Sequence, residues 1–332
     1  MRWIALVATL LATPAQAAWK HVDLDADVTL RAVAVVDAQR FHVSGSKGTH
    51  AVTKDGGKTW RNSIPADGAA LDFRGVAALD AKTAVLMSAG DGPAGLARLY
   101  RTADAGRTWT LVFETREKGS FLDAVAFRDA RRGFVLGDPI DGRWFLLQTK
   151  DGGKTWARIP GPSAEPGEAA FAASNSALFL GPGRELWIVS GGLAQGRVAR
   201  SRSDGAQWDS LDTPIAGSAS AGVFGGLALG KGRAVVVGGD YKDELRAGVS
   251  LALLERFDMW TPPNEGAPRL LEGVGRLDVR TLIAVGPRGT AVSTDNGQSW
   301  KQVDEEAFHA IACRARTCVA AGGNGRVAVW AP

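Results

Sequence analysis

A pattern of eight residues recurs along the chain, and it constrains the fold more than any other feature of the sequence. Residues 53–60 read TKDGGKTW, residues 149–156 repeat them letter for letter, and residues 102–109 and 293–300 are close variants. A worn copy at residues 201–208 keeps the glycine and the tryptophan, but its acid has moved by one place. Copies at such regular spacing indicate that the chain is built from repeats.

The residue types of this pattern suit a tight turn between two strands. The aspartate can accept hydrogen bonds from nearby amides and hydroxyls, the glycine adopts a positive φ, and the tryptophan covers the turn with an apolar face. This is the Asp-box pattern, or BNR repeat, and we expect a structural role for its acids and tryptophans. They are Asp55, Trp60, Asp104, Trp109, Asp151, Trp156, Asp295 and Trp300.

Each Asp box belongs to a longer unit with the plan of a four-stranded sheet. In the third unit, runs at residues 121–127, 133–136, 143–149 and 156–159 predict four strands, with residues 137–142 as the second turn. Four short strands per unit are typical of a propeller blade. Similar units cover residues 30–64, 71–113, 169–211, 219–261 and 274–303, whereas the last unit, residues 308–330, has three strands.

The missing strand of the last unit lies at the other end of the chain. Residues 19–22 read WKHV, and residues 300–303, which end the last Asp box and follow it, read WKQV. An N-terminal strand that completes the last blade would close the ring without a free edge. The sequence therefore predicts an all-β fold: one domain, residues 18–332, forming a seven-bladed β-propeller with four antiparallel strands per blade.

The first residues predict export. Arg2 precedes an apolar run at residues 3–11, and Ala-Gln-Ala at residues 15–17 supplies a cleavage site, so residues 1–17 have the pattern of a signal peptide. No other stretch is long and apolar enough to span a membrane. We expect a secreted monomer, with the periplasm as its favoured location, in which Cys313 and Cys318 form a disulfide across a hairpin turn.

Charged residues divide between the two faces of the predicted propeller. The face with the Asp boxes is basic, through Arg128, Arg131, Arg132, Arg184, Arg233, Arg314 and Arg316. The opposite loops carry Asp91, Asp138, Asp141, Asp240 and Lys242. A basic face suits an acidic partner or an anionic membrane surface, but charged turns also serve solubility alone. The aspartates could act as an acid–base pair or bind calcium, or they could cap turns.

The order of these features resembles the photosystem II stability and assembly factor-like family of Asp-box propellers, over nearly the whole mature chain. The most telling stretches are residues 121–139, which end in LGDP, and residues 216–241, which contain SAGVF at 220–224; the run VGGDYK begins at residue 237. The resemblance implies a non-enzymatic binding or assembly factor, a scaffold for a protein partner that could be a subunit of a membrane or periplasmic complex.

A sialidase-like glycoside hydrolase is the alternative, because many Asp-box propellers cleave sugars. Such an enzyme pairs a tyrosine nucleophile with an acid, for which Tyr241 and Glu244 are the candidates. A redox enzyme is disfavoured, because no G-x-G-x-x-G follows a strand and opens a helix. The four histidines show no metal-ligand spacing, so we predict neither a metal nor another cofactor. The net charge of +4 does not by itself indicate nucleic-acid binding, and export argues against it.

Overall fold

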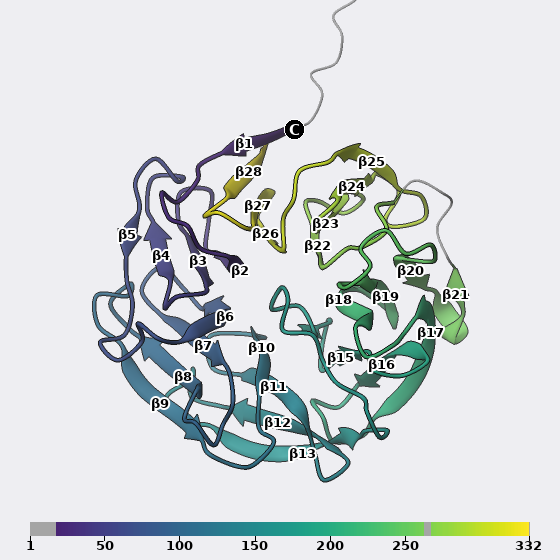
Figure 1. Cartoon of the computed structure of the whole chain (residues 1–332), viewed down its shortest axis with the longest axis horizontal. Helices are drawn as coiled ribbons and strands as arrows, with labels where there is room; N and C mark the ends of the chain where they lie inside the picture. The colour runs from purple at the N-terminus through teal and green to yellow at the C-terminus, as the bar shows by residue number, and fades with distance from the viewer. Residues whose placement is uncertain (1–17, 262–266, 332) are drawn as a thin grey trace, which may run out of the picture.

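The computed structural model describes residues 18–261 and 267–331, which form seven four-stranded antiparallel sheets arranged in a ring (Figure 1). The prediction of a seven-bladed β-propeller with four strands per blade is confirmed. The predicted signal peptide, residues 1–17, lies outside the described residues. Within the described ranges, no helix is long and apolar enough to cross a membrane.

The strands of a blade follow one another from the channel to the outer rim (Figure 1). Blade 1 comprises β2 (Leu30–Val35), β3 (Phe41–Gly45), β4 (His50–Thr53) and β5 (Arg61–Asn62); blade 2 comprises β6 (Asp72–Ala78), β7 (Ala84–Ala89), β8 (Ala97–Thr102) and β9 (Thr110–Thr115). Blade 3 comprises β10 (Leu122–Phe127), β11 (Gly133–Ile140), β12 (Arg143–Thr149) and β13 (Ala157–Ser163); blade 4 comprises β14 (Leu178–Leu180), β15 (Leu186–Ser190), β16 (Gln195–Ser201) and β17 (Asp209–Ala216).

The remaining blades complete the ring. Blade 5 comprises β18 (Ala221–Gly230), β19 (Arg233–Asp240), β20 (Leu251–Leu254), the 3₁₀ turn η1 (Arg256–Asp258) and β21 (Trp260–Thr261); blade 6 comprises β22 (Gly273–Arg276), β23 (Leu282–Gly286), β24 (Gly289–Ser293) and β25 (Lys301–Asp304). Blade 7 comprises β26 (Ala310–Arg314), β27 (Thr317–Ala321) and β28 (Val327–Ala331), with β1 (Ala18–His21) as its outer strand.

Blade 7 joins the two ends of the described chain, as the sequence predicts. Strand β1 pairs antiparallel with β28, and Trp19 lies opposite Trp330 in the register. The indole Nε1 of Trp19 donates a hydrogen bond to Thr290 Oγ1 of blade 6 at 2.9 Å. The predicted disulfide between Cys313 and Cys318 is also present, and it joins facing positions of β26 and β27. Ring closure therefore depends on residues from both ends of the sequence.

The repeated turn between the third and fourth strands has a defined set of hydrogen bonds. In blade 1, the Asp55 carboxylate accepts from the Thr53 hydroxyl at 2.8 Å, the Thr59 amide at 2.9 Å and the Thr59 hydroxyl at 2.6 Å. These bonds lower the pKa of Asp55 to about 2. Asp104, Asp151 and Asp295 are bound in the same way.

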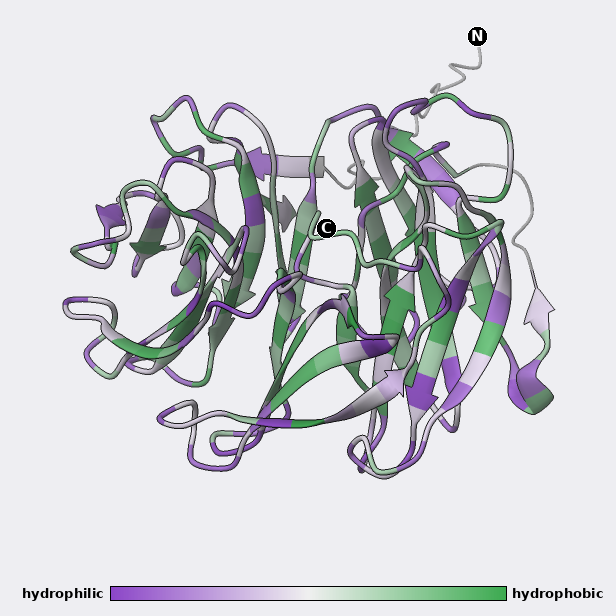
Figure 2. Cartoon of the chain, turned by 60° about the horizontal axis from the view of Figure 1, so that its bottom comes forward, coloured by the Kyte–Doolittle hydropathy of each residue, from purple (hydrophilic) through white to green (hydrophobic). Residues whose placement is uncertain are grey.

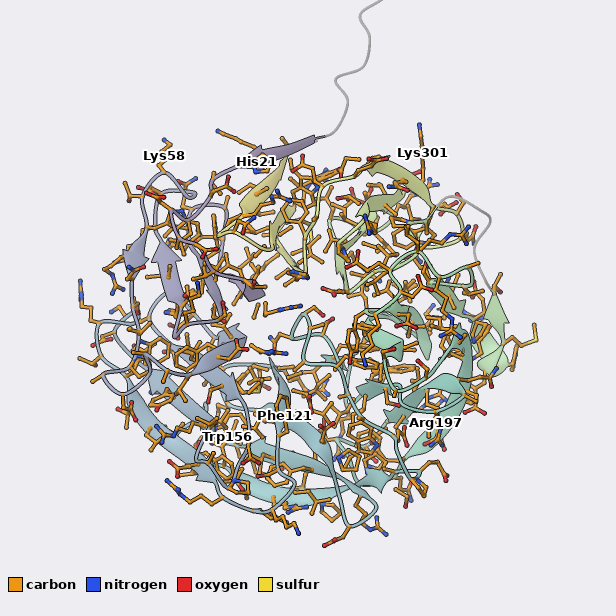
Figure 3. The ribbon with its side chains drawn as sticks, in the orientation of Figure 1. His21, Lys58, Phe121, Trp156, Arg197 and Lys301 are labelled. Carbon is orange, nitrogen blue, oxygen red and sulfur yellow. A yellow bond between two sulfur atoms is a disulfide. The ribbon has the colours of Figure 1, made fainter. Side chains whose placement is uncertain are left out.

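The same turn also packs against the preceding blade. Gly153 of blade 3 has a φ of 79°, and a Cβ on it would lie 2.8 Å from Val85 Cγ2 of blade 2. Trp156, from the same turn, packs edge-on against Phe127 of its own blade, with ring centroids 5.8 Å apart. Figure 3 shows Lys58 of one such turn and Lys301 just after another pointing outward at the rim. The turn identifies the fold, and its aspartate carboxylates already have hydrogen-bonding partners within the turn.

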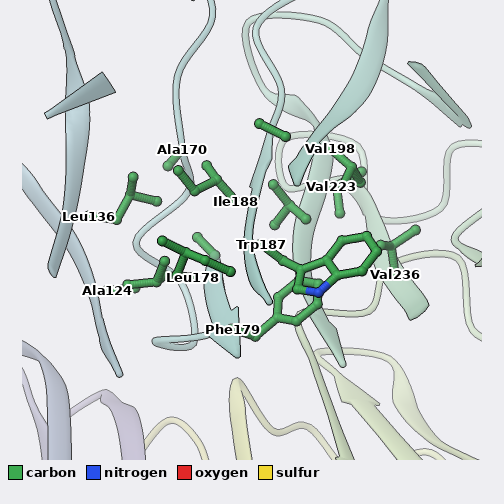
Figure 4. Packing of buried hydrophobic residues seen from close by; sticks show 14 of the residues in the cluster. Ala124, Leu136, Ala170, Leu178, Phe179, Trp187, Ile188, Val198, Val223 and Val236 are labelled. Atoms are coloured by element: carbon green, nitrogen blue, oxygen red, sulfur yellow. The ribbon is translucent and has the colours of Figure 1, made fainter. Parts of the chain in front are cut away.

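The hydrophobic core lies between neighbouring blades, so the middle strands are buried on both sides. Strand β7 and strand β15 are buried at every residue, which explains why each is apolar apart from one serine. Between blades 3, 4 and 5, Trp187 stacks on Phe179 with ring centroids 5.7 Å apart, and Leu136 and Val236 belong to the same cluster (Figure 4). Hydrophobic residues follow the strands, and hydrophilic residues gather in the loops (Figure 2).

Two segments differ from the sequence prediction, and both help to form the cavity at one mouth of the central channel. The expected turn at residues 137–142 is wrong, because β11 continues to Ile140 with a bulge between Gly137 and Pro139. The bulge accommodates Pro139, which has no backbone N–H for the ladder. In blade 4 the inner strand begins at Leu178 rather than near residue 169. The residues before it run across the channel instead.

Candidate functional site

Several inner strands contain a β-bulge near the same mouth of the central channel. At each bulge one or more residues have no partner on the neighbouring strand. The register of β2 skips Arg31, that of β10 skips Asp123 and that of β18 skips Phe224. In β6 the skipped segment includes Arg74. A β-bulge of this kind re-aims a side chain away from the regular alternation of a strand. These four side chains line one cavity.

Blades 6 and 7 contribute the matching positions. Glu272 immediately precedes β22, and His309 immediately precedes β26; both line the same cavity. This set is not among the site residues predicted from the sequence, although the sequence carries a signal for it. Each such residue stands between a large apolar and a small residue: LRA at 30–32, FRG at 73–75, LDA at 122–124, VFG at 223–225, LEG at 271–273 and FHA at 308–310.

The segment before β14 crosses the channel and closes one side of this cavity. Asn175 Oδ1 accepts from the Val125 amide of blade 3 at 2.8 Å, and Asn175 Nδ2 donates to the Val76 carbonyl of blade 2 at 3.3 Å. Ser174 Oγ donates to the Glu272 carbonyl of blade 6 at 2.6 Å. A single stretch of chain therefore joins three blades across the ring, and Ala169 to Ala173, just before it, line the cavity.

The cavity has a volume of about 580 Å³, a size that is common for ligand sites in proteins. Its wall combines ionisable groups with aromatic and small apolar side chains. The polar and aromatic members are Arg31, Arg74, Phe121, Asp123, Asp138, Phe171, Phe224, Tyr241, Glu244, Glu272 and His309.

Most of the charged groups in the wall are paired with one another or with a neighbour. Glu272 Oε2 lies 2.6 Å from His309 Nδ1 and 3.8 Å from Arg31 Nη1. Arg74 Nε donates to Asp72 Oδ2 at 2.7 Å. Glu244 Oε2 lies 2.7 Å from Nε of Arg288. The cations of the cavity wall therefore all have a carboxylate partner.

Two carboxyl groups of the wall have no such compensation. Asp123 is 1% exposed, and its Oδ2 has no hydrogen-bonding partner among the described residues. Burial and the neighbouring Asp138 raise the pKa of Asp123 well above its usual range. Asp138 accepts the Ala170 amide at 3.0 Å, and burial raises its pKa to about 6. Paired, buried carboxyls with raised pKa values are typical of functional sites.

An aromatic cluster forms the opposite part of the wall. Phe171 and Phe224 stack with ring centroids 4.3 Å apart and an interplanar angle of 10°. Tyr241 packs edge-on to Phe171 at 5.9 Å and remains 47% exposed. Leu245, four residues along the same loop, is 65% exposed. This side of the mouth therefore offers apolar surface to a partner.

The predicted acidic residues of this face have different environments. Asp138 lies in the cavity, whereas Asp240 is buried and accepts from the Lys242 amide and from Arg246 at 3.0 and 3.1 Å. Asp240 therefore caps its own loop. Asp91, Asp141 and Lys242 are exposed. Tyr241 and Glu244, the pair considered for a glycosidase, both line the cavity, although the carboxylate of Glu244 is held by Arg288.

The predicted basic face divides in a similar way. Arg131, Arg132 and Arg184 lie around an open groove of about 1020 Å³ between blades 3 and 4. Arg128 is not on the surface: its side chain is 9% exposed and donates to the carbonyls of Gly181 and Glu185. The other predicted cations do not join this groove. Arg233 is paired with Glu255, and Arg314 and Arg316 are exposed on blade 7.

Within residues 18–261 and 267–331, no three histidine, cysteine or acidic side chains lie close enough together to hold a metal ion.

No protein-family model and no curated protein sequence matches the chain. Solved structures match it along its whole propeller. YCF48 bound to D1 peptide is 16% identical with a TM-score of 0.70, and covers 95% of this chain and 97% of that one. YCF48 from Cyanidioschyzon merolae is 13% identical with a TM-score of 0.71, covering 95% and 99%. At such identity the likeness concerns the fold alone.

A second kind of propeller is also similar. A GH74 xyloglucanase from Xanthomonas campestris is 15% identical with a TM-score of 0.63; the match covers 94% of this chain but 53% of the enzyme. The present chain thus corresponds to about half of that protein. Both a peptide-binding protein and a glycoside hydrolase share the fold, so the function must be argued from the site.

Proposed function

We propose that this protein is a non-catalytic binding or assembly factor, and that it holds a segment of a protein partner at the mouth of its central channel. The observation that carries the proposal is the cavity, where an exposed aromatic rim borders the buried carboxyl of Asp123 and the half-buried carboxyl of Asp138. Exposed aromatic groups beside well-packed polar ones are what binding surfaces use to anchor a partner. The similar structure of YCF48 with a bound D1 peptide supports this choice.

The cellular setting is part of the same proposal. The partner is a subunit of a membrane or periplasmic complex, and the protein meets it after export. The signal-peptide pattern of residues 1–17 supports export. The disulfide between Cys313 and Cys318 suits an oxidising compartment. Cell fractionation, with mass measurement of a mature chain that starts at residue 18, checks this part on its own.

The two faces of the propeller can be separated experimentally. A tagged mature protein is used to capture partners from periplasmic extract and from solubilised membranes. The variant Tyr241→Ser/Leu245→Ser changes exposed residues at the cavity face, and the control Arg131→Glu/Arg132→Glu changes the opposite face. We expect the first variant to lose the captured partner and the second to keep it. If only the control variant loses the captured partner, binding occurs on the basic face, and the choice of site is refuted.

A glycoside hydrolase is the second candidate, because Tyr241 and Glu244 line the same cavity as the Asp123–Asp138 pair. The salt bridge from Glu244 to Arg288 disfavours it, since the carboxylate is then committed to the guanidinium. Turnover of a fluorogenic sialoside that disappears in Tyr241→Phe would replace the binding proposal with this one.

A further inference from the structure

The ion pairs around the cavity leave two carboxyl groups without a cationic partner. Three cations pair with three carboxylates: Arg31 with Glu272, Arg74 with Asp72 and Arg288 with Glu244. His309 shares Glu272 with Arg31. Asp123 and Asp138 form no ion pair in the described part of the chain, although the charge of Arg74 acts on Asp123. These two carboxyl groups are therefore available to a cationic ligand.

The carboxyl group of Asp123 is in an unfavourable environment when the cavity is empty. Its side chain lines the cavity and is 1% exposed, yet one carboxyl oxygen has no hydrogen-bonding partner in the described structure. A buried polar atom without a partner is unfavourable, and a suitable donor would remove this cost. Asp138 lies close enough to disfavour ionisation of Asp123. A donor that also carries positive charge would satisfy both groups at once.

The rest of the wall suits the uncharged part of such a ligand. Phe171, Phe224 and Tyr241 form a continuous aromatic cluster beside the carboxyls. Ala169, Ala170 and Ala172 add small apolar side chains. Aromatic rings also attract cations through their faces and cover alkyl stems. An amine or guanidinium at the end of an alkyl chain matches both halves of the cavity.

We propose that the channel mouth recognises a lysine or arginine side chain of the bound protein partner, with the cation placed between Asp123 and Asp138 and its alkyl stem against the aromatic cluster. This inference rests on the proposed function, because it names the part of the partner that enters the cavity. An anionic group would find the nearby cations already paired, and it would add charge beside two unpaired carboxyls.

Cation binding has a signature that a purely structural role of Asp123 would not produce. A cation next to a carboxyl pair favours the ionised forms, so binding releases a proton that the empty cavity holds. The charged groups that face this pair across the cavity are Arg31, Arg74, Glu244, Glu272 and His309. Calorimetry in two buffers with different ionisation enthalpies measures the released proton directly.

The test uses the full mature protein and three blocked pentapeptides that differ only in a central lysine, norleucine or glutamate. We expect the lysine peptide to bind roughly tenfold or more tightly than the norleucine peptide, with proton release. Asp123→Asn and Asp138→Asn should remove this preference. Asp141→Asn, an exposed aspartate in the adjacent turn, is the matched control and should keep it. Because Asp123 is buried, circular dichroism of each variant confirms that it is folded.

The outcomes separate this inference from the proposed function. Equal binding of the lysine and norleucine peptides, lost in Tyr241→Ser, would overturn cation recognition and leave a peptide-binding mouth. A preference for the glutamate peptide would also overturn it. If none of the peptides binds, the inference is wrong, and the capture experiment decides the proposed function by itself.

Discussion

A pair of buried histidines in blade 1 predicts that the protein loses stability in mild acid. His42 of β3 and His50 of β4 are 3% and 0% exposed, and His42 Nδ1 lies 3.1 Å from His50 Nε2. His50 Nδ1 donates to the Ser63 carbonyl at 2.6 Å, which leaves Nε2 as the acceptor of the His42 proton. Protonation of His50 would place two N–H groups face to face. The pair is therefore held neutral.

The pKa values give the direction and the size of the effect. Burial, with Arg61 nearby, lowers the pKa of His42 to about 4; burial, with His42 and Arg61 nearby, lowers that of His50 to about 3. An unfolded histidine titrates near pH 6.5, so below that pH the unfolded chain binds more protons and the folded state loses stability. At pH 5 each histidine costs about 2 kcal/mol, and the pair about 4 kcal/mol.

Other groups titrate in the same range, so the comparison must be made between variants. The raised pKa of Asp138, about 6, works in the opposite direction, because its folded form gains a proton as the pH falls. Urea unfolding at pH 7 and pH 5 is therefore compared between the wild type and His42→Gln/His50→Gln, in which the carboxyls are unchanged. The wild type should lose about 4 kcal/mol more than the double variant, and His50→Gln alone should remove about half of that difference. If the free energy of unfolding falls equally between pH 7 and pH 5 in the wild type and in the double variant, the reasoning is refuted.

Three further predictions concern stability. Trp19→Ala removes a 7% exposed indole that closes the ring against Phe308 and Trp330, and should cost about 3–5 kcal/mol in thermal unfolding; an unchanged midpoint would contradict closure by β1. Reduction of Cys313–Cys318, which closes a short loop with a sequence separation of 5, should cost at most about 2 kcal/mol in urea unfolding under dithiothreitol. Gly153→Ala should destabilise more than Gly142→Ala, by about 1–3 kcal/mol, because both have a positive φ but only the Cβ at 153 meets a neighbouring blade; equal losses would show that the φ alone matters.

Much of the fold could be predicted because its turn signal recurs in five of the seven blades, one of these copies being worn. The Asp-box tryptophans set the blade length, and the likeness of residues 19–22 to residues 300–303 identified β1 as the strand that closes the ring. The errors arose where a local residue outweighed the pattern. Pro139 beside Asp138 was interpreted as a turn, whereas the strand passes through it by means of a bulge. The predicted start of blade 4, residue 169, is too early, because the apolar segment before β14 resembles a strand in sequence.

The candidate site was harder to predict, because its residues differ in chemistry and share only their place in the blade and the apolar and small residues that flank them. Arg31, Arg74, Asp123, Phe224, Glu272 and His309 come from six blades and meet only when the ring closes. Sequence reasoning found Asp138 through the neighbouring proline, and Tyr241 and Glu244 through their chemistry. It did not find Asp123, which is buried and occurs in an ordinary strand sequence, LDAVAF.

In the worn turn of blade 4, a serine replaces the turn aspartate, and the neighbouring aspartate forms salt bridges instead. Ser203 stands where the other turns have aspartate, and it performs the same work: its Oγ accepts the Gln207 amide at 2.9 Å. The displaced acid, Asp204, instead pairs with Arg128 at 3.1 Å and Arg184 at 3.0 Å. Arg128 was expected on a basic surface because its sequence position is an exposed turn. Its side chain is instead 9% exposed, because the neighbouring blade supplies both a carboxylate and two carbonyls to receive its guanidinium. The burial and the hydrogen-bonding partners of a side chain in a repeat therefore depend on the neighbouring blade as much as on its own blade.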